Sequence, residues 1–130
     1  MNIPSNLKYT KSDEWVKVEG NIATIGITDY AQDQLSDIVF WESIADVDEE
    51  VSAASTVASL ESVKAAGDVA TPFAGKIIEL NTELDQTPEM VNSDPYGAAW
   101  MVKIEISDPS ELDALLDAET YRTHCEERSE

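Results

Sequence analysis

The chain has 130 residues, 27 of them acidic and 8 basic, which gives a formal net charge of -19, and 42% of its residues are hydrophobic. This length and composition predict one globular domain over residues 1–130, with a core over about 7–121 and an acidic tail over 122–130. So large a negative charge repels phosphate backbones and anionic lipid heads, which disfavours nucleic acid and membranes as partners and favours proteins with basic patches.

The N-terminal part of the chain predicts a β-hairpin followed by a short helix. Residues 14–19 and 22–27 alternate apolar and polar side chains, and the Gly-Asn pair between them is typical of a tight hairpin turn. Thr28 is a suitable cap for a helix over residues 29–35, because an acidic residue follows it in the first turn.

The next segment, residues 37–44, returns to strand character. Its apolar side chains are expected to alternate, with Val39 and Trp41 on one face and Ile38 and Phe40 on the other. Both faces of this strand are therefore predicted to be partly covered.

Further strands are expected over residues 56–61, 70–80 and 100–106. They bring the predicted total to five or six short strands.

The acidic run over residues 46–50 is interpreted as a solvated loop, with a docking patch for a basic partner as the alternative. The stretch over residues 81–99 predicts a long irregular connection with one helical turn near Pro88.

The C-terminal part predicts helical structure. Residues 108–111 supply a cap, a proline at the first helical position and an acidic residue at the third. Leu112, Leu115 and Leu116 then form an apolar stripe. Asp117 is a cap for a second helical segment that runs to about Glu126. The residues from there to Glu130 are expected to fray.

Cysteine usage and the N-terminus indicate the cellular compartment. Cys125 is the only cysteine, which leaves no internal disulfide framework and fits a reducing compartment. Residues 1–5 show no secretory or organellar signal, and the apolar runs are too short to span a bilayer. We therefore expect a cytoplasmic protein, in which Cys125 is an inert thiol and the adjacent His124 forms no metal site.

The segment over residues 56–75 is organised around one lysine. Two apolar strand segments flank a stretch of small residues that carries Lys64. A lone lysine at a turn is ordinarily a solvated charge. A covalent carrier, however, needs a primary amine on an exposed and rigid turn, so that an attaching enzyme can reach it and the finished arm can move between distant active sites.

Five blocks of the sequence resemble, in order, those of the glycine cleavage system H proteins. They read SDEWVKVEG, IGITDYAQDQL, ESVKA, NSDPYG and SDPSELDALLD, and the resemblance extends from about Leu7 to Tyr121. The order and the separations of the blocks make it highly specific.

The resemblance implies the fold class and the cofactor. The fold would be mainly β, a barrel-sandwich hybrid of the lipoyl/biotinyl-carrier type with two small antiparallel sheets, a short helix in the N-terminal half and a C-terminal helix. The lysine of ESVKA, which is Lys64, would carry a covalently bound lipoate. The chain would be a non-catalytic lipoyl carrier and a monomer.

The resemblance also implies a reaction cycle and a set of partners. The lipoyl arm would take an aminomethyl group of glycine from a pyridoxal-phosphate glycine decarboxylase, pass it to a tetrahydrofolate-dependent aminomethyltransferase and be reoxidised by dihydrolipoyl dehydrogenase. Lipoate-attaching enzymes would be further partners. In the family, the loaded arm folds into a surface cleft, whose lining corresponds to Ser12, Glu14 and Asp68 here. Two carboxylates and a hydroxyl suit a cationic amine.

Three departures from the family's pattern bear on that cleft and its surroundings. Asp13 replaces a common histidine and adds a negative charge beside the cleft. Gly67 replaces a common serine and loosens the backbone at the base of the arm. The stretch between Phe40 and Glu61 lacks the usual proline and glycine and has one extra residue, which predicts a shifted acidic loop.

Several alternatives stay open beside this interpretation. A lipoyl domain of a 2-oxoacid dehydrogenase or a biotin carrier shares the fold, but typically shows D-K-A or M-K-M and a Pro/Ala-rich linker, where this chain has V-K-A. An H-like protein that donates lipoate to other proteins would use the same Lys64. An enzyme with Glu14 and Asp68 as an acid/base pair is the third alternative, although the sequence shows no accompanying nucleophile or metal ligands.

Overall fold

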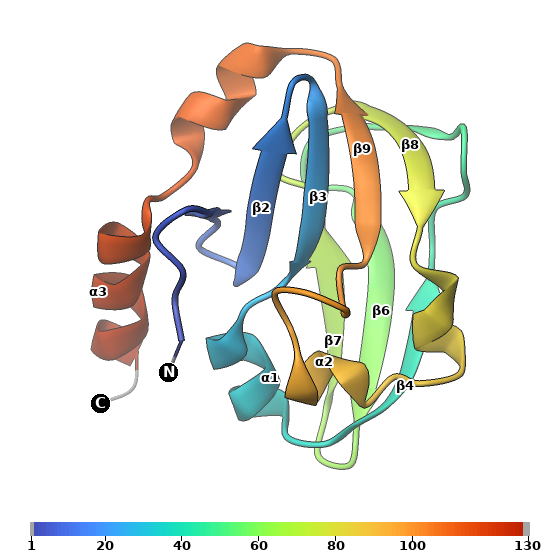
Figure 1. The fold of residues 1–130 in the computed structure, drawn as a ribbon, viewed down its shortest axis with the longest axis vertical. Coiled ribbons are helices and arrows are strands. Elements are labelled where there is room, and N and C mark those ends of the chain that lie inside the picture. The colour runs from blue at the N-terminus through green and yellow to red at the C-terminus, as the bar shows by residue number, and fades with distance from the viewer. Residues whose placement is uncertain (1, 129–130) are drawn as a thin grey trace.

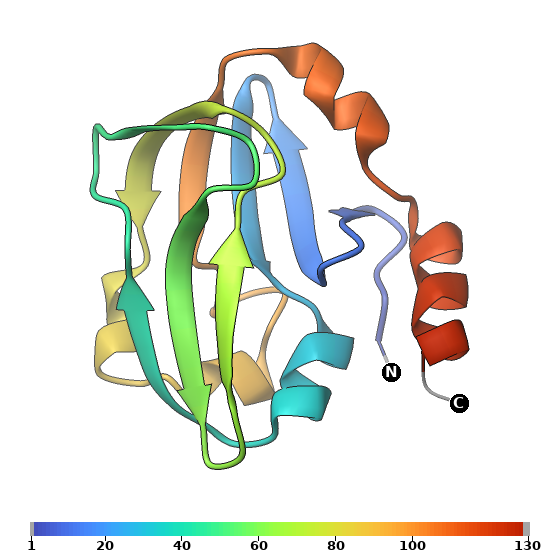
Figure 2. The ribbon, with the colours of Figure 1, turned by 180° about the vertical axis from the view of Figure 1, so that it is seen from behind.

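Two antiparallel β-sheets packed face to face form the body of the protein (Figure 1, Figure 2). The structure is a computed structural model and describes residues 2–128. The larger sheet has the strand order β1-β2-β3-β9-β8-β5, and the smaller one has the order β4-β6-β7. The strands are β1 (Lys8–Tyr9), β2 (Glu14–Glu19), β3 (Ile22–Ile27), β4 (Ile38–Ser43), β5 (Glu50–Val51), β6 (Thr56–Ser62), β7 (Ala66–Ala70), β8 (Gly75–Leu80) and β9 (Val102–Ile106).

The helical segments are short and lie at the ends and along one side of this sandwich (Figure 1). They are α1 (Asp29–Leu35), η1 (Thr82–Asp85), α2 (Met90–Ser93), η2 (Pro109–Ala114) and α3 (Ala118–Arg128). The mainly β fold class and the barrel-sandwich architecture are thus confirmed, but the described residues form nine strands and not five or six. Within residues 2–128, no helix is long and apolar enough to cross a membrane.

The opening hairpin and helix form where the sequence predicts them. Strands β2 and β3 pair from Glu14 opposite Ile27 to Glu19 opposite Ile22, and Gly20 takes a positive φ of 63° in the turn between them. The Thr28 hydroxyl accepts a hydrogen bond from the amide of Ala31 and so caps α1.

Strand β4 does not alternate as predicted. Its pairing with β6 shifts between Ile38 and Phe40, which is the signature of a β-bulge. Ile38 and Trp41 are therefore buried, whereas Val39 and Phe40 are 54% and 45% exposed. The expected grouping of Val39 with Trp41 is wrong because the extra residue of the bulge reverses the facing of the strand.

The segment expected as one strand over residues 70–80 is two strands in different sheets. Strand β7 ends at Ala70 and belongs to the small sheet, and β8 begins at Gly75 in the large sheet. Pro72 lies between them and has no amide hydrogen for a strand ladder. The acidic run over 46–50 is likewise not all loop, because Glu50 begins β5 and pairs with Lys76.

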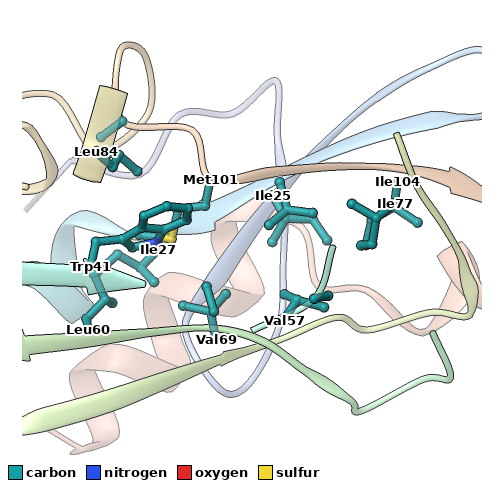
Figure 3. Close-up of a cluster of buried hydrophobic side chains, with 14 of the residues drawn as sticks. Ile25, Ile27, Trp41, Val57, Leu60, Val69, Ile77, Leu84, Met101 and Ile104 are labelled. Atoms are coloured by element: carbon teal, nitrogen blue, oxygen red, sulfur yellow. The ribbon is translucent and has the colours of Figure 1, made fainter. Parts of the chain in front are cut away.

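The main core fills the space between the two sheets (Figure 3). Ile25 and Ile104 enter it from the large sheet, and Val57, Leu60 and Val69 enter it from the small sheet. All five side chains are at most 2% exposed. Burial of this apolar surface holds the sheets together and fixes the positions of the turns at their edges.

Helix α3 packs outside the large sheet, beside the N-terminal segment (Figure 1). Tyr121 stacks on Tyr9 with ring centroids 4.7 Å apart, and Cys125 is fully buried. The helix continues to Arg128. The expectation of a tail from residue 122 and of fraying after Glu126 is therefore wrong over residues 122–128, since this segment is helical and buries Cys125. Residues 129–130 lie outside the described part.

Candidate functional site

Lys64 lies on the exposed turn that joins β6 to β7, which we call the Lys64 turn (residues 63–65) (Figure 2). The hydroxyl of Ser62 accepts hydrogen bonds from the amides of Lys64 (3.1 Å) and Ala65 (2.9 Å). The amide of Val63 donates to the carbonyl of Asp37 (3.0 Å). These bonds give the turn a defined shape, so the lysine is presented on a rigid support.

The amine of Lys64 points toward helix α1. Its Nζ lies 3.3 Å from the carbonyl oxygen of Gln34, a residue near the end of that helix. Lys64 itself is exposed, and the two small residues that follow it, Ala65 and Ala66, are exposed as well. A partner protein therefore has open access to this amine.

A cavity of about 220 Å³, which we call the cleft, opens beside Lys64. It is lined by Ser12, Asp13, Ile27, Ala31, Gln34, Leu35, Leu60, Gly67 and Asp68. We call the turn before β2 and helix α1 the two walls of the cleft; the other lining residues belong to β3, β6 and β7. Gln34 belongs to the cleft and also contacts Lys64, so the amine lies at the cleft's edge. The volume is below that of a usual substrate pocket and suits the end of a narrow chain.

The structure brings two of the three predicted cleft residues to the cleft surface. Ser12 and Asp68 both line it. Asp68 is exposed, on β7, four residues after Lys64. Gly67 is held inside β7 opposite Leu60, and a Cβ added to it would lie 3.6 Å from the Leu35 side chain.

Glu14, the third predicted residue, is buried behind Ser12 and does not line the cleft. Its side chain is only 2% exposed, although a surface position was expected. The hydroxyls of Thr10 and Ser12 each donate to its Oε1 at 2.6 Å, and the amide of Ala70 donates to Oε2 at 3.4 Å. Burial raises the pKa of Glu14, and the hydrogen bonds from Ser12 and Thr10 counteract part of that effect. Glu14 thus orients the Ser12 hydroxyl through this hydrogen bond.

The added negative charge of Asp13 is paired. The guanidinium of Arg128 binds its carboxylate with two hydrogen bonds, at 2.6 and 3.0 Å. The Tyr121 hydroxyl donates to the same carboxylate at 2.8 Å. Asp13 lines the cleft, but its charge is neutralised by a neighbour from the opposite end of the chain.

Sequence reasoning missed three residues of this site. Ser62 has a local signal, since a serine two residues before a turn residue commonly bonds the turn's amides. Gln34 acts through its backbone carbonyl, which any residue could supply. Arg128 contacts Asp13 across 115 positions of the chain, and no spacing rule connects residues so far apart.

A second cavity and possible metal-binding clusters were the other candidates for a functional site. A larger, more open hollow of about 470 Å³ lies between α3 and Lys11, and neither Lys64 nor the predicted cleft residues line it. Over residues 2–128, no group of three or more His, Cys, Asp or Glu side chains is arranged to hold a metal ion.

Comparisons with known proteins agree with this architecture. The sequence model of the family described as "Glycine cleavage H-protein" matches residues 7–128. The glycine cleavage system H proteins of Staphylococcus haemolyticus and Staphylococcus epidermidis are each 54% identical, over 94% and 93% of this chain and 96% and 95% of their own length.

A solved structure shows the same similarity in three dimensions. The crystal structure of a glycine cleavage system H protein from Mycobacterium marinum superposes with a TM-score of 0.83 at 33% identity. The match covers 93% of this chain and 97% of that one. Sequence and fold therefore agree over nearly the whole length, and the chain belongs to the glycine cleavage H-protein family.

Proposed function

We propose that the protein is the lipoyl carrier of a glycine cleavage system and that Lys64 is its attachment site. The observation that carries this proposal is the placement of one exposed lysine amine on a rigid turn, at the edge of a cleft, in a member of this family. Attachment forms an amide between Nζ of Lys64 and the carboxyl carbon of lipoate; the amine loses a proton, and the carboxyl carbon loses the activating group that the attaching enzyme supplies. It removes one positive charge from a surface that has few.

The residues of the cleft fit a lipoyl arm. Four apolar side chains provide a surface for an aliphatic chain: Ile27, Ala31, Leu35 and Leu60. Ser12 and Asp68 place a hydroxyl and a carboxylate beside them. An apolar surface beside two hydrogen-bond acceptors suits an aliphatic arm that ends in a cationic amine.

The chain contributes attachment, presentation and shelter, and the chemistry belongs to its partners. When bound, lipoate supplies a disulfide that carries the aminomethyl group of glycine between glycine decarboxylase, aminomethyltransferase and dihydrolipoyl dehydrogenase. Lys64 holds the arm, and the open surface around the turn admits those enzymes and a lipoate-attaching enzyme. We place this function in the cytoplasm of the cell and in a monomer.

Each polar residue of the cleft has a distinct role in this proposal. Asp68 pairs the cationic amine directly, because its carboxylate is exposed at the cleft surface. Ser12 accepts a hydrogen bond from that amine, since its own hydrogen is donated to Glu14. Glu14 is a positioning residue that orients the Ser12 hydroxyl from its buried place.

The attachment site is tested by intact-mass measurement of protein made in a host that supplies lipoate and the attaching enzyme. Wild-type protein should gain the mass of one lipoyl group, and peptide mapping should place it on Lys64. The K64R variant should stay unmodified, because a guanidinium is not acylated in place of an amine. The matched control K76R changes an exposed lysine of β8 and should be modified like wild type. An unmodified wild type, or a modified K64R, contradicts the proposal.

The role of the cleft is tested by the stability of the loaded carrier. Glycine-loaded protein, separated from its enzymes, should lose ammonia about tenfold faster or more in D68N than in wild type, because one charge-assisted hydrogen bond is worth about 1.5–3 kcal/mol. The control E61Q removes an exposed charge from the neighbouring strand and should behave like wild type. Equal rates in D68N and wild type refute the role of Asp68.

A further inference from the structure

We propose that the C-terminal helix α3 is a brace for the cleft and that Tyr121 and Arg128 are its positioning residues. The brace joins the two walls of the cleft, which are the turn before β2 and the helix α1. Its effect on a bound arm rests on the function proposed above. Its effect on the walls belongs to the unmodified chain and is tested separately.

Tyr121 contacts both walls through one hydroxyl group. The hydroxyl donates to Oδ1 of Asp13 at 2.8 Å, and it lies 2.6 Å from the hydroxyl of Thr28. Burial raises the pKa of Tyr121, so the hydroxyl keeps its hydrogen for Asp13 and accepts from Thr28. The Thr28 oxygen in turn accepts from the amide of Ala31 and caps α1. One chain of hydrogen bonds thus connects the turn, α3 and the start of α1.

Arg128 contacts the same two walls by different interactions. Its guanidinium binds the Asp13 carboxylate with two hydrogen bonds and lies over the ring of Tyr30, with the guanidinium carbon 4.6 Å from the centroid. Tyr30 is a residue of α1. Tyr121 and Arg128, seven residues apart on α3, therefore each connect the turn before β2 to α1.

The ion pair of this brace differs from the other ion pairs of residues 2–128. Three other pairs span 3.5 to 3.7 Å, and their side chains are 36–79% exposed. Arg128 and Asp13 approach to 2.6 Å, and their side chains are 33% and 19% exposed. A bidentate and partly shielded pair has a defined geometry, whereas exposed pairs at long distance contribute little.

Both walls need such support. Helix α1 has only seven residues and buries none of them, and a helix this short is unstable without outside contacts. Asp13 has a positive φ of 74°, an uncommon backbone conformation that its neighbours must maintain. The amide of Thr28 also donates to the carbonyl of Asp13 at 3.0 Å, so the walls meet at this point.

The walls are tested in the unmodified protein by amide hydrogen exchange. In R128Q, the amides of Thr28 and Gln32 should exchange about fivefold to tenfold faster, because an ion pair and a cation–π contact are lost. The amide of Met101, which donates to Ile25 in the large sheet, should keep its wild-type rate. The control R122Q removes the same charge from an exposed position of the same helix and should change neither rate. Unchanged exchange at Thr28 and Gln32 in R128Q overturns the brace.

Two further variants separate positioning from general stability. R128K keeps the charge and should restore part of the wild-type exchange rate. The double variant D13N/R128Q should exchange no faster at Thr28 than R128Q alone, since the asparagine keeps an oxygen that accepts from the Tyr121 hydroxyl and both changes remove the same ion pair. Additive effects, or no recovery in R128K, also overturn the brace.

The effect on the arm is read from the loss of ammonia by the glycine-loaded carrier. R128Q should lose it at least threefold faster than wild type and R122Q should not. A faster loss in D68N with a wild-type rate in R128Q overturns the positioning role of α3 and leaves the proposed cleft intact. If both D68N and R128Q lose ammonia at the wild-type rate, the cleft does not protect the arm. The amide exchange rates of Thr28 and Gln32 then decide alone whether α3 supports the walls.

Discussion

Replacement of the buried Glu14 by glutamine tests the balance between desolvation and hydrogen bonding behind the cleft. Glutamine has the same shape and keeps an oxygen that accepts from the hydroxyls of Thr10 and Ser12, which are 2.6 Å from the carboxylate. Its amide nitrogen would face the amide of Ala70, whose bond to the carboxylate is long, at 3.4 Å. The change therefore removes a charge and one weak bond while the cleft surface stays the same.

The direction of the pKa shift gives the sign of the effect. Burial is the largest influence on Glu14 and raises its pKa above the ordinary value of 4.5, so folding disfavours the charged form relative to the unfolded chain. A raised pKa contributes stability that is fully present below pH 4.5 and is lost as the pH rises through the folded pKa. Each unit of pKa is equivalent to about 1.4 kcal/mol. Glutamine has no ionisable group, so its contribution to the free energy of unfolding does not change with pH.

Urea unfolding at pH 4.5 and pH 7.5 measures this balance. The free energy of unfolding of E14Q, relative to wild type, should be higher at pH 7.5 than at pH 4.5. The control E61Q removes an exposed charge from β6, and subtracting its effect corrects for the general relief of repulsion in a chain of net charge -19. An E14Q variant that loses stability relative to wild type as the pH rises would show that the charge-assisted hydrogen bonds outweigh desolvation.

Three further predictions concern the Lys64 turn, the cleft floor and the charge. S62A removes the hydroxyl that binds the amides of Lys64 and Ala65, so it should cost about 1 kcal/mol of unfolding free energy and raise amide exchange at Ala65; an unchanged exchange rate there contradicts the rigid turn. G67S should fold like wild type in thermal unfolding, because its Cβ would lie 3.6 Å from Leu35, but its side chain should narrow the cleft and speed ammonia loss from the loaded carrier; a large drop in melting temperature contradicts this fit. Binding to glycine decarboxylase should slow in stopped-flow measurements as added salt brings the Debye length to about 10 Å, and a salt-independent rate shows that the acidity serves solubility alone.

Local patterns predicted those parts of the fold that local interactions determine. The first hairpin depends on alternation and a Gly-Asn turn, and α1 depends on the Thr28 cap, so both formed at the predicted residues. Strand β4 was placed correctly along the chain but not in its facing, because a bulge is caused by pairing with β6 and leaves no mark on the apolar pattern. The strand expected over residues 70–80 crosses from one sheet to the other at Pro72, and the apolar pattern on either side of the proline does not show that change of sheet.

The candidate site divides in the same way. The family resemblance predicted Lys64, Ser12 and Asp68 because the motifs around them are short and ordered. In the structure, Ser12 and Asp68 line one cleft, and Lys64 contacts Gln34, which also lines it. The burial of Glu14 could not be predicted, since its neighbours Ser12 and Trp15 are compatible with either face of the strand. Burial depends on Thr10 and Ala70, which approach it only in the folded chain.

The position of Asp13 shows how far a single substitution can be interpreted from its neighbours alone. From its position next to Ser12, Asp13 was expected to add one more negative charge to a cleft that binds a cation. In the folded protein its carboxylate accepts hydrogen bonds from Tyr121 and Arg128, and the pair with Arg128 is neutral. Asp13 therefore connects the turn before β2 to α3. In the function proposed above, the carboxylate that attracts a cationic amine in the cleft is that of Asp68, which is exposed.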